Sequence, residues 1–250
     1  MRNPFLIRPK WPAARRVRAF VTTRMLPSGN EGSKPPYHAF NLAAHVGDDP
    51  EQVQRNRELL KQHILLPAEP CWLKQVHGNT VCEAEVWKEP PEADAAWTTK
   101  TDTPCVVLTA DCVPILLCDR AGTMAAAIHA GWKGLHNGII LKTVGALPGP
   151  PERLLAWMGP AIGPRAYEVD RKVHELFVTL NPAFATAFKP ADPGHWRFDL
   201  YRVARMQLEA CGIEDIYGGD RCTYTESSVF YSYRRDGETG RMASLIWLQS

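Results

Sequence analysis

Short apolar runs, each about as long as a β-strand, dominate the middle of the chain. They span Cys105–Ala110, Val113–Cys118 and Thr123–His129. Apolar runs of this length predict strands buried inside a sheet. Gly122 predicts a turn between the second and third runs, and Pro114 predicts that Asp111 and Cys112 lie at a strand end or kink.

Polar and apolar positions on either side of this centre alternate with strand or helix periodicity. Further strands are expected at Arg18–Thr22, Val81–Trp87 and Leu154–Met158. Helices are expected at Pro50–His63, Asn137–Leu147, Asp170–Leu180 and Asp199–Cys211, with Asp49 and Asp199 as N-caps. The residues Asp236–Gly240 predict a hairpin turn between strands at Val229–Tyr233 and Arg241–Leu248.

Composition agrees with an ordinary globular protein of mixed α+β class. Of its 250 residues, 45% are hydrophobic and 22% are charged. The chain has no internal repeat and no low-complexity linker, so we expect a single domain over residues 1–250.

Charge and cysteine content exclude several classes of protein. The net charge is +2, and the basic residues form no dense stripe, so no nucleic-acid partner is expected. The N-terminus has no signal-peptide run, and no apolar stretch is long enough to span a membrane. Seven cysteines without a Cys-x-x-Cys motif argue against a disulfide framework. We therefore expect a cytoplasmic monomer that binds small molecules.

Three residues capable of binding a metal stand in unusual sequence surroundings. His129 ends an apolar run and precedes the small residues Ala130 and Gly131. Cys112 ends another run, and His77 lies within Trp72–Gly78. Two imidazoles and a thiolate form a plausible three-ligand zinc set with one open position for chemistry. Their spacing alone also allows core histidines and a buried thiol.

Several motifs resemble those of the YfiH family, also called the laccase-domain or multicopper polyphenol oxidase family and, in bacteria, peptidoglycan editing factor. They follow one another over nearly the whole chain. The matching stretches are residues 41–42 and 45–50, Gln75–Gly78, Ala93–Ala95, Thr109–Pro114, His129–Trp132, Met158–Pro164, Gly218–Thr223 and Phe230–Ala243.

The resemblance implies a fold, a metal and an activity. The implied fold is a layered α/β/β/α arrangement with mixed sheets, like that of the cytotoxic necrotizing factor toxins. The implied cofactor is zinc, held by His77, Cys112 and His129. The implied activity is purine nucleoside phosphorolysis on adenosine, inosine, guanosine and methylthioadenosine, together with adenosine deamination.

Phosphorolysis requires groups that hold phosphate and move a proton. We interpret Cys112 and His129 as the catalytic centre, and Asp111 and Asp94 as acid–base or supporting carboxylates. The candidates for substrate contacts are Arg24, Asn41, His45, Lys133 and Arg165. The chain departs from the family in the loop after Thr23 and Arg24, where the usual paired glycines are missing, so substrate preference can differ.

Four alternative functions remain open. A copper polyphenol oxidase would need a separate trinuclear cluster, but the chain has no His-x-His pair, and copper remains an adventitious or alternative metal for one site. A metal-free Cys112–His129 hydrolase would use a free thiolate. An enzyme that edits peptidoglycan precursors and a non-enzymatic partner protein are the other two.

Overall fold

Two stacked β-sheets form the centre of the protein. The computed structural model describes residues 5–27, 29–85 and 87–250. The four-stranded sheet has the order β1-β2-β13-β5 and is antiparallel throughout. Its strands are β1 (Leu6–Ile7), β2 (Val17–Thr22), β13 (Met242–Leu248) and β5 (Cys105–Thr109).

The second sheet is six-stranded and mixed. Its order is β12-β8-β6-β7-β4-β3, and the pairs β12/β8 and β3/β4 are parallel, whereas the inner pairs are antiparallel. Its strands are β12 (Asp215–Gly218), β8 (Leu154–Met158), β6 (Val113–Asp119), β7 (Ala125–Ala130), β4 (Ala95–Thr98) and β3 (Val81–Glu83).

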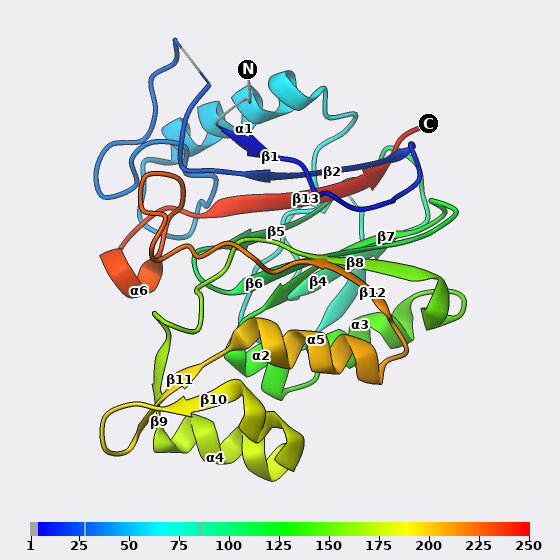
Figure 1. Ribbon diagram of the computed structural model, residues 1–250. Helices are drawn as coiled ribbons and strands as arrows, with labels where there is room; N and C mark the ends of the chain where they lie inside the picture. Colours follow the sequence, from blue (N-terminus) through cyan, green and yellow to red (C-terminus); the bar gives the residue numbers. More distant parts are fainter. Residues whose placement is uncertain (1–4, 28, 86) are drawn as a thin grey trace.

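Helices cover the outer faces of both sheets, which gives the expected α/β/β/α layers (Figure 1). Helix α1 (Pro50–Ile64) covers the four-stranded sheet. Helices α2 (Trp132–His136), α3 (Ile139–Ala146) and α5 (Leu200–Ala210) cover the six-stranded sheet. A small three-stranded sheet carries α4 below them. This sheet consists of β10 (Phe188–Pro190), β11 (His195–Phe198) and β9 (Glu168–Asp170), and α4 spans Arg171–Leu180. The short helix α6 (Tyr233–Asp236) precedes β13 in the sequence.

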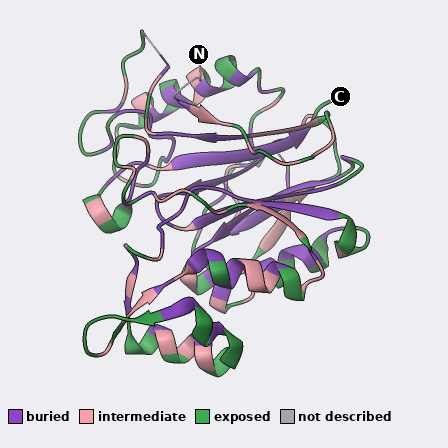
Figure 2. Ribbon diagram, in the orientation of Figure 1, coloured by how far each residue is buried: buried purple, intermediate pink, exposed green. Residues whose placement is uncertain are grey.

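Three hydrophobic clusters hold these layers together. Leu116 and Ile246 belong to the cluster between the two sheets, Leu60 to the one beneath α1, and Leu208 to the one beneath α3 and α5. All residues of β6, β7, β8 and β13 are buried, and Figure 2 shows these strands as the buried centre of the protein. The apolar runs that form β6 and β7 are therefore central strands with both faces covered, whereas the run at Cys105–Ala110 forms β5, a buried strand at the edge of the four-stranded sheet.

Several predicted elements are confirmed at their ends. The side chain of Asp49 accepts a hydrogen bond from the Glu51 amide at the start of α1, and that of Asp199 accepts one from the Arg202 amide at the start of α5. Gly122 has a φ of 69° in the turn between β6 and β7, a backbone conformation that glycine adopts without strain.

Two predictions about local structure are wrong. Residues 229–233 form no strand with β13, which instead pairs with β2 and β5, because two long-range neighbours bury the whole strand. The side chain of Ser232 caps the helical turn α6 at the site of the expected hairpin.

The expected strand at Val81–Trp87 is shorter in the structure, ending at Glu83, and Val86 lies outside the described residues. Across the described residues, no helix is both long enough and apolar enough to span a bilayer. All seven cysteines are free thiols in the structure.

Candidate metal centre

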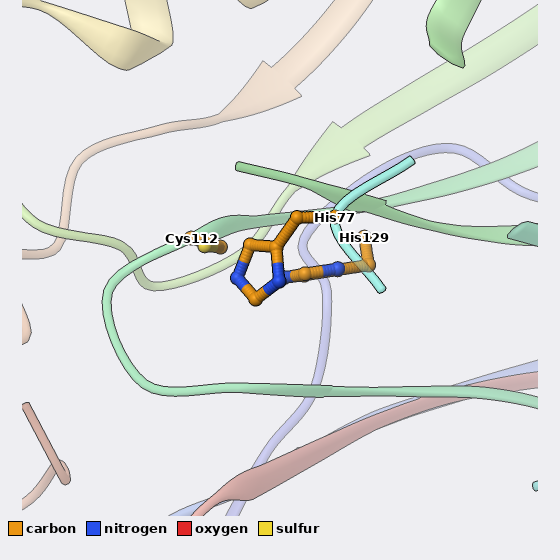
Figure 3. Close-up of side chains that lie close together, drawn as sticks. All are labelled: His77, Cys112 and His129. Atoms are coloured by element: carbon orange, nitrogen blue, oxygen red, sulfur yellow. The ribbon is translucent and has the colours of Figure 1, made fainter. Parts of the chain in front are cut away.

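Three side chains from distant parts of the sequence meet at one end of the six-stranded sheet. One ligand atom each of His77, Cys112 and His129 lies within 4.8 Å of the others. Figure 3 shows the two imidazoles and the thiol pointing toward one another. Because Pro114 of β6 pairs with His129 of β7, Cys112 at the start of β6 lies beside the end of β7.

The loop that carries His77 is held by one buried carboxylate. His77 has a φ of 59°, a left-handed conformation that is uncommon for a residue with a side chain. The backbone amides of Val76, His77 and Gly78 donate to the carboxylate of Asp94 at 3.3, 3.0 and 2.6 Å. These hydrogen bonds stabilise the loop in the conformation that directs His77 toward Cys112.

The same carboxylate also orients His129. The Nδ1 atom of His129 lies 2.8 Å from Oδ1 of Asp94, and both side chains are buried. A carboxylate accepts hydrogen bonds, so Nδ1 carries a proton, and Nε2 is the nitrogen that can bind a metal once it gives up its own proton. Asp94 therefore positions two of the three ligands at once.

Electrostatics favour a thiolate at Cys112. Burial alone would raise the pKa of this thiol, but the charges and hydrogen bonds of His129 and His77 outweigh it and lower the pKa to about 6. Burial would likewise lower the pKa of His129, but the Cys112 thiolate and Asp94 raise it to about 9. Burial would raise the pKa of Asp94, but the hydrogen bond and charge of His129, together with the amides of Gly78 and Val76, outweigh it and lower the pKa below its usual value.

Gly131 leaves the space in which the ligands meet. A Cβ atom at this position would lie 2.7 Å from Sγ of Cys112 and 3.2 Å from Cδ2 of His77. Any larger residue would collide with two ligands, so the small residue that follows His129 is a packing requirement of the centre.

Asp111, next to Cys112, fixes the backbone before β6. It has a φ of 99°. Its carboxylate accepts hydrogen bonds from the Thr223 hydroxyl at 2.6 Å and the Arg234 amide at 2.7 Å, and its carbonyl accepts one from Ile162 at 2.9 Å. Both carboxylate oxygens are thus engaged in joining three loops around the centre, which favours a supporting role over proton transfer.

Comparisons with known proteins identify the family of this chain. A family model described as a multi-copper polyphenol oxidoreductase laccase matches residues 18–249. The chain belongs to this family. Its relatives include a protein of Pseudomonas aeruginosa named purine nucleoside phosphorylase, which is 49% identical over 96% of this chain and 97% of its own. The purine nucleoside phosphorylase YfiH of Escherichia coli is 47% identical over 97% and 98% of the two chains.

Solved structures of family members have the same fold. A crystal structure of a Neisseria meningitidis protein superimposes with a TM-score of 0.93 at 44% identity, covering 98% of this chain and 100% of the other. YlmD of Geobacillus stearothermophilus gives a TM-score of 0.87 at 31% identity, with coverages of 96% and 94%. The layered fold that the motifs implied is therefore confirmed for this YfiH-family chain.

The five predicted substrate residues occupy different surroundings. Arg24 donates to the carbonyls of His38 and Ser227 and lies over the ring of Tyr231, so it joins two loops. Asn41 is buried, and its Oδ1 accepts a hydrogen bond from the backbone amide of Arg241 at 3.0 Å. Its side-chain Nδ2 donates to the carboxylate of Asp48 at 2.9 Å. These contacts assign both residues to the support of the loops around the centre.

His45 is the predicted substrate residue with the clearest electrostatic link to the centre. The side chain is exposed, but its reduced contact with water and the positive charges of Arg241, Arg57, His129 and His77 lower its pKa, which favours the neutral imidazole at pH 7. Lys133 and Arg165 are both exposed. Lys133 lies two residues after Gly131, with Nζ 5.8 Å from the Trp132 ring centroid.

Sequence reasoning missed Arg241 as a member of this site. Arg241 is partly buried, its guanidinium interacts electrostatically with Cys112 and Asp111, and it lies 5.8 Å from the ring centroid of Tyr233. Its side chain donates to the carbonyls of Thr239 and Gly240, which fixes its direction. Arg241 falls in the last matching motif, Phe230–Ala243, and this was the available signal, although nothing in the sequence brings that segment to Cys112.

Proposed function

We propose that the protein is a zinc-dependent purine nucleoside phosphorylase. The observation that carries the proposal is the pair of relatives at 49% and 47% identity that are named purine nucleoside phosphorylases and align over nearly the whole chain. The geometry of the site supports the proposal, because its charges suit phosphate and its ligand set suits a metal.

The donor set fits zinc. Zinc favours thiolate and imidazole ligands, and three protein ligands leave a fourth position open in catalytic sites. His77, Cys112 and His129 would hold the ion, with the Cys112 pKa already lowered and His129 oriented by Asp94. When bound, zinc would supply a Lewis acid that stabilises developing negative charge.

In phosphorolysis, an oxygen of phosphate bonds to C1′ of the ribose while the bond from C1′ to the purine nitrogen breaks. The electron pair of that bond leaves with the purine, which takes up a proton, and ribose 1-phosphate is released. A cationic group must hold the phosphate in line for this displacement. Both Arg24 and Arg241 donate to loop carbonyls, but Arg241 suits this role better because it also interacts electrostatically with Cys112 and Asp111.

His45 and Tyr233 complete the proposed substrate contacts. The neutral imidazole of His45 can accept a hydrogen bond from a ribose hydroxyl or from protonated phosphate. Tyr233 is 60% exposed beside Arg241, so its ring is available to stack on a purine. Lys133 and Arg165, on the exposed surface, are candidates for further phosphate contacts.

Adenosine deamination is the second proposed activity, since it would use the same ligand set and the same purine contacts. It also needs a carboxylate that shuttles a proton. Both oxygens of Asp111 and Asp94 are occupied by hydrogen bonds, which places deamination behind phosphorolysis.

Polyphenol oxidation ranks lower despite the family's name. A multicopper oxidase needs several metal sites, whereas His77, Cys112 and His129 are the only group of possible ligands of this kind in the part of the chain that the structure describes. A metal-free hydrolase would use the contact between Cys112 and His129 without a metal. Metal analysis of the purified protein distinguishes it from the proposed zinc enzyme. Editing of peptidoglycan precursors stays a prediction of the resemblance alone.

The proposal is tested with purified full-length protein and adenosine. With phosphate, we expect adenine and ribose 1-phosphate by chromatography, and near-stoichiometric zinc by metal analysis. His129→Ala is expected to lose both adenine formation and bound zinc. The matched control is His195→Ala, which replaces an exposed histidine on β11 and is expected to keep the activity and the zinc. Absence of adenine with zinc-loaded wild-type protein would refute phosphorolysis, and inosine formed without phosphate would favour deamination.

A further inference from the structure

A cavity of about 800 Å³ opens at one edge of the stacked sheets. It lies where β1 and β2 of one sheet face β8 and β12 of the other (Figure 1). Its walls include neither the three metal ligands nor Arg241. Its volume is in the range of pockets that enclose ligands of nucleotide size, larger than inorganic phosphate alone requires.

Positive charge gathers on this cavity without compensation. Arg8, Lys10 and Arg18 line it, and none of them has an ion-pair partner or hydrogen-bond acceptor within residues 5–27, 29–85 and 87–250. A fourth cation, Arg221, is paired with Glu226, and Asp220 is the one carboxylate in the wall. Three uncompensated cations around one cavity favour an anionic ligand.

An indole donor also faces the cavity. Trp157, in β8, is 6% exposed, and no acceptor for its Nε1 hydrogen lies among the described residues. Gly218 borders this atom, and a Cβ there would lie 2.8 Å from Nε1 and 2.3 Å from the Met158 carbonyl oxygen. Because Gly218 has no side chain, the indole edge is left open to a ligand acceptor.

Aromatic surface completes the wall. Phe20, Trp157 and Tyr217 all line the cavity. The guanidinium of Arg8 lies 4.8 Å from the ring centroid of Phe20, which places a charged donor directly beside apolar surface. A ligand that matches all of these features has a dianionic group, a flat apolar part and a hydrogen-bond acceptor on that part.

We propose that this cavity is a second ligand site, one that binds a nucleoside monophosphate. The phosphate contacts Arg8, Lys10 and Arg18, and the base lies against Trp157 and Tyr217 with a ring nitrogen or carbonyl accepting from the indole. This site is independent of the proposed phosphorolysis, because its walls contain none of the residues assigned to that reaction.

The test is equilibrium dialysis of adenosine monophosphate against the full-length protein. We expect saturable one-to-one binding, with adenosine and inorganic phosphate each binding at least about tenfold more weakly, since each lacks half of the contacts. Arg8→Glu and Arg18→Glu are expected to weaken binding about tenfold or more by charge reversal. Trp157→Phe, which keeps the ring and removes the donor, is expected to weaken it by about threefold to tenfold.

Two controls separate this site from the rest of the protein. Arg16→Glu makes the same charge change at an exposed arginine just before β2 that does not line the cavity, and we expect affinity within about twofold of wild type. His129→Ala disables the metal centre and is expected to leave the affinity unchanged. The proposal is overturned if adenosine monophosphate does not bind, if Arg18→Glu and Arg16→Glu weaken binding equally, or if His129→Ala abolishes it.

Discussion

Replacing Gly131 with alanine tests the geometry of the metal centre most directly. The added Cβ would lie 2.7 Å from Sγ of Cys112, roughly 1 Å closer than an ordinary van der Waals contact allows. It would also lie 3.2 Å from Cδ2 of His77. The residue is buried between α2 and β7, so the overlap can be relieved only by moving one ligand or the helix.

The expected effect follows from the tolerance of zinc coordination. Zinc–sulfur and zinc–nitrogen bonds tolerate deviations of only about 0.2 Å, so a ligand displaced by several tenths of an ångström binds poorly. We expect zinc affinity to fall by about 10- to 100-fold, similar to the loss of a supporting residue in other zinc sites. Overpacking is expected to lower the free energy of unfolding of the metal-free protein by about 1–3 kcal/mol.

Zinc affinity is measured by competition with a chromophoric chelator, and stability by urea unfolding after chelation. Gly145→Ala is the matched control, because Gly145 lies in α3 and its added Cβ would have no neighbour within 4 Å. The control should bind zinc as wild type does. Wild-type zinc affinity in Gly131→Ala would refute the reasoning, because it would show that the ligands do not meet beside this glycine.

Three further predictions address the charges of the site. Asp94→Asn should weaken zinc binding by about 10- to 100-fold in the chelator assay, since it removes the acceptor of His129 and of three loop amides. The pKa of Asp94 is lower in the folded than in the unfolded protein. Its contribution to stability is therefore complete above the unfolded pKa of about 3.9 and is lost as the pH falls through the folded pKa. The free energy of unfolding of metal-free Asp94→Asn should consequently depend less on pH in acid than that of the metal-free wild type. In protein freed of metal by a chelator, the Cys112 thiolate should appear near pH 6 as an absorbance at 240 nm, and this signal should be missing in Cys112→Ala. The ion pair between the thiolate and His129 should be lost above about pH 9. A Cys112 thiol that titrates near pH 8.5 would contradict this prediction. Arg241→Met should raise the KM for phosphate by about tenfold or more, with zinc content unchanged, in a steady-state assay at varied phosphate; an unchanged KM would remove Arg241 from the phosphate site.

The elements of the central sheet were predictable because their sequence patterns are local. The runs at β6, β7 and β8 contain enough apolar residues to be buried on both faces, and few alternatives to a central strand exist for them. Helices α1 and α5 were predicted from their N-cap aspartates and helical spacing for the same reason. The C-terminal hairpin was wrong because the turn residues at Asp236–Gly240 say nothing about which strands pair with β13.

Cys112 and His129 were visible in the sequence as residues at the ends of apolar runs, whereas His77 was picked out by the family motif Gln75–Gly78. The convergence of the three ligands depends on the register between β6 and β7 and on the hydrogen bonds from the His77 loop to Asp94, which lies 17 residues after His77 in the sequence. Local sequence patterns reveal neither of them. The hydrogen bonds of Asp111 with Thr223 and Arg234 span more than a hundred residues, which is why its supporting role was not separable from proton transfer beforehand.

By itself, the sequence determined which segments are buried and which side chains can bind a metal, because hydrophobicity and ligand chemistry belong to individual residues. Only the tertiary structure decided that Arg241, rather than Arg24, lies near the thiolate, and that a basic cavity opens where β2 faces β8. Charges interact over distances in space, and the chain brings residues 112 and 241 together only through the pairing of β13 with β5.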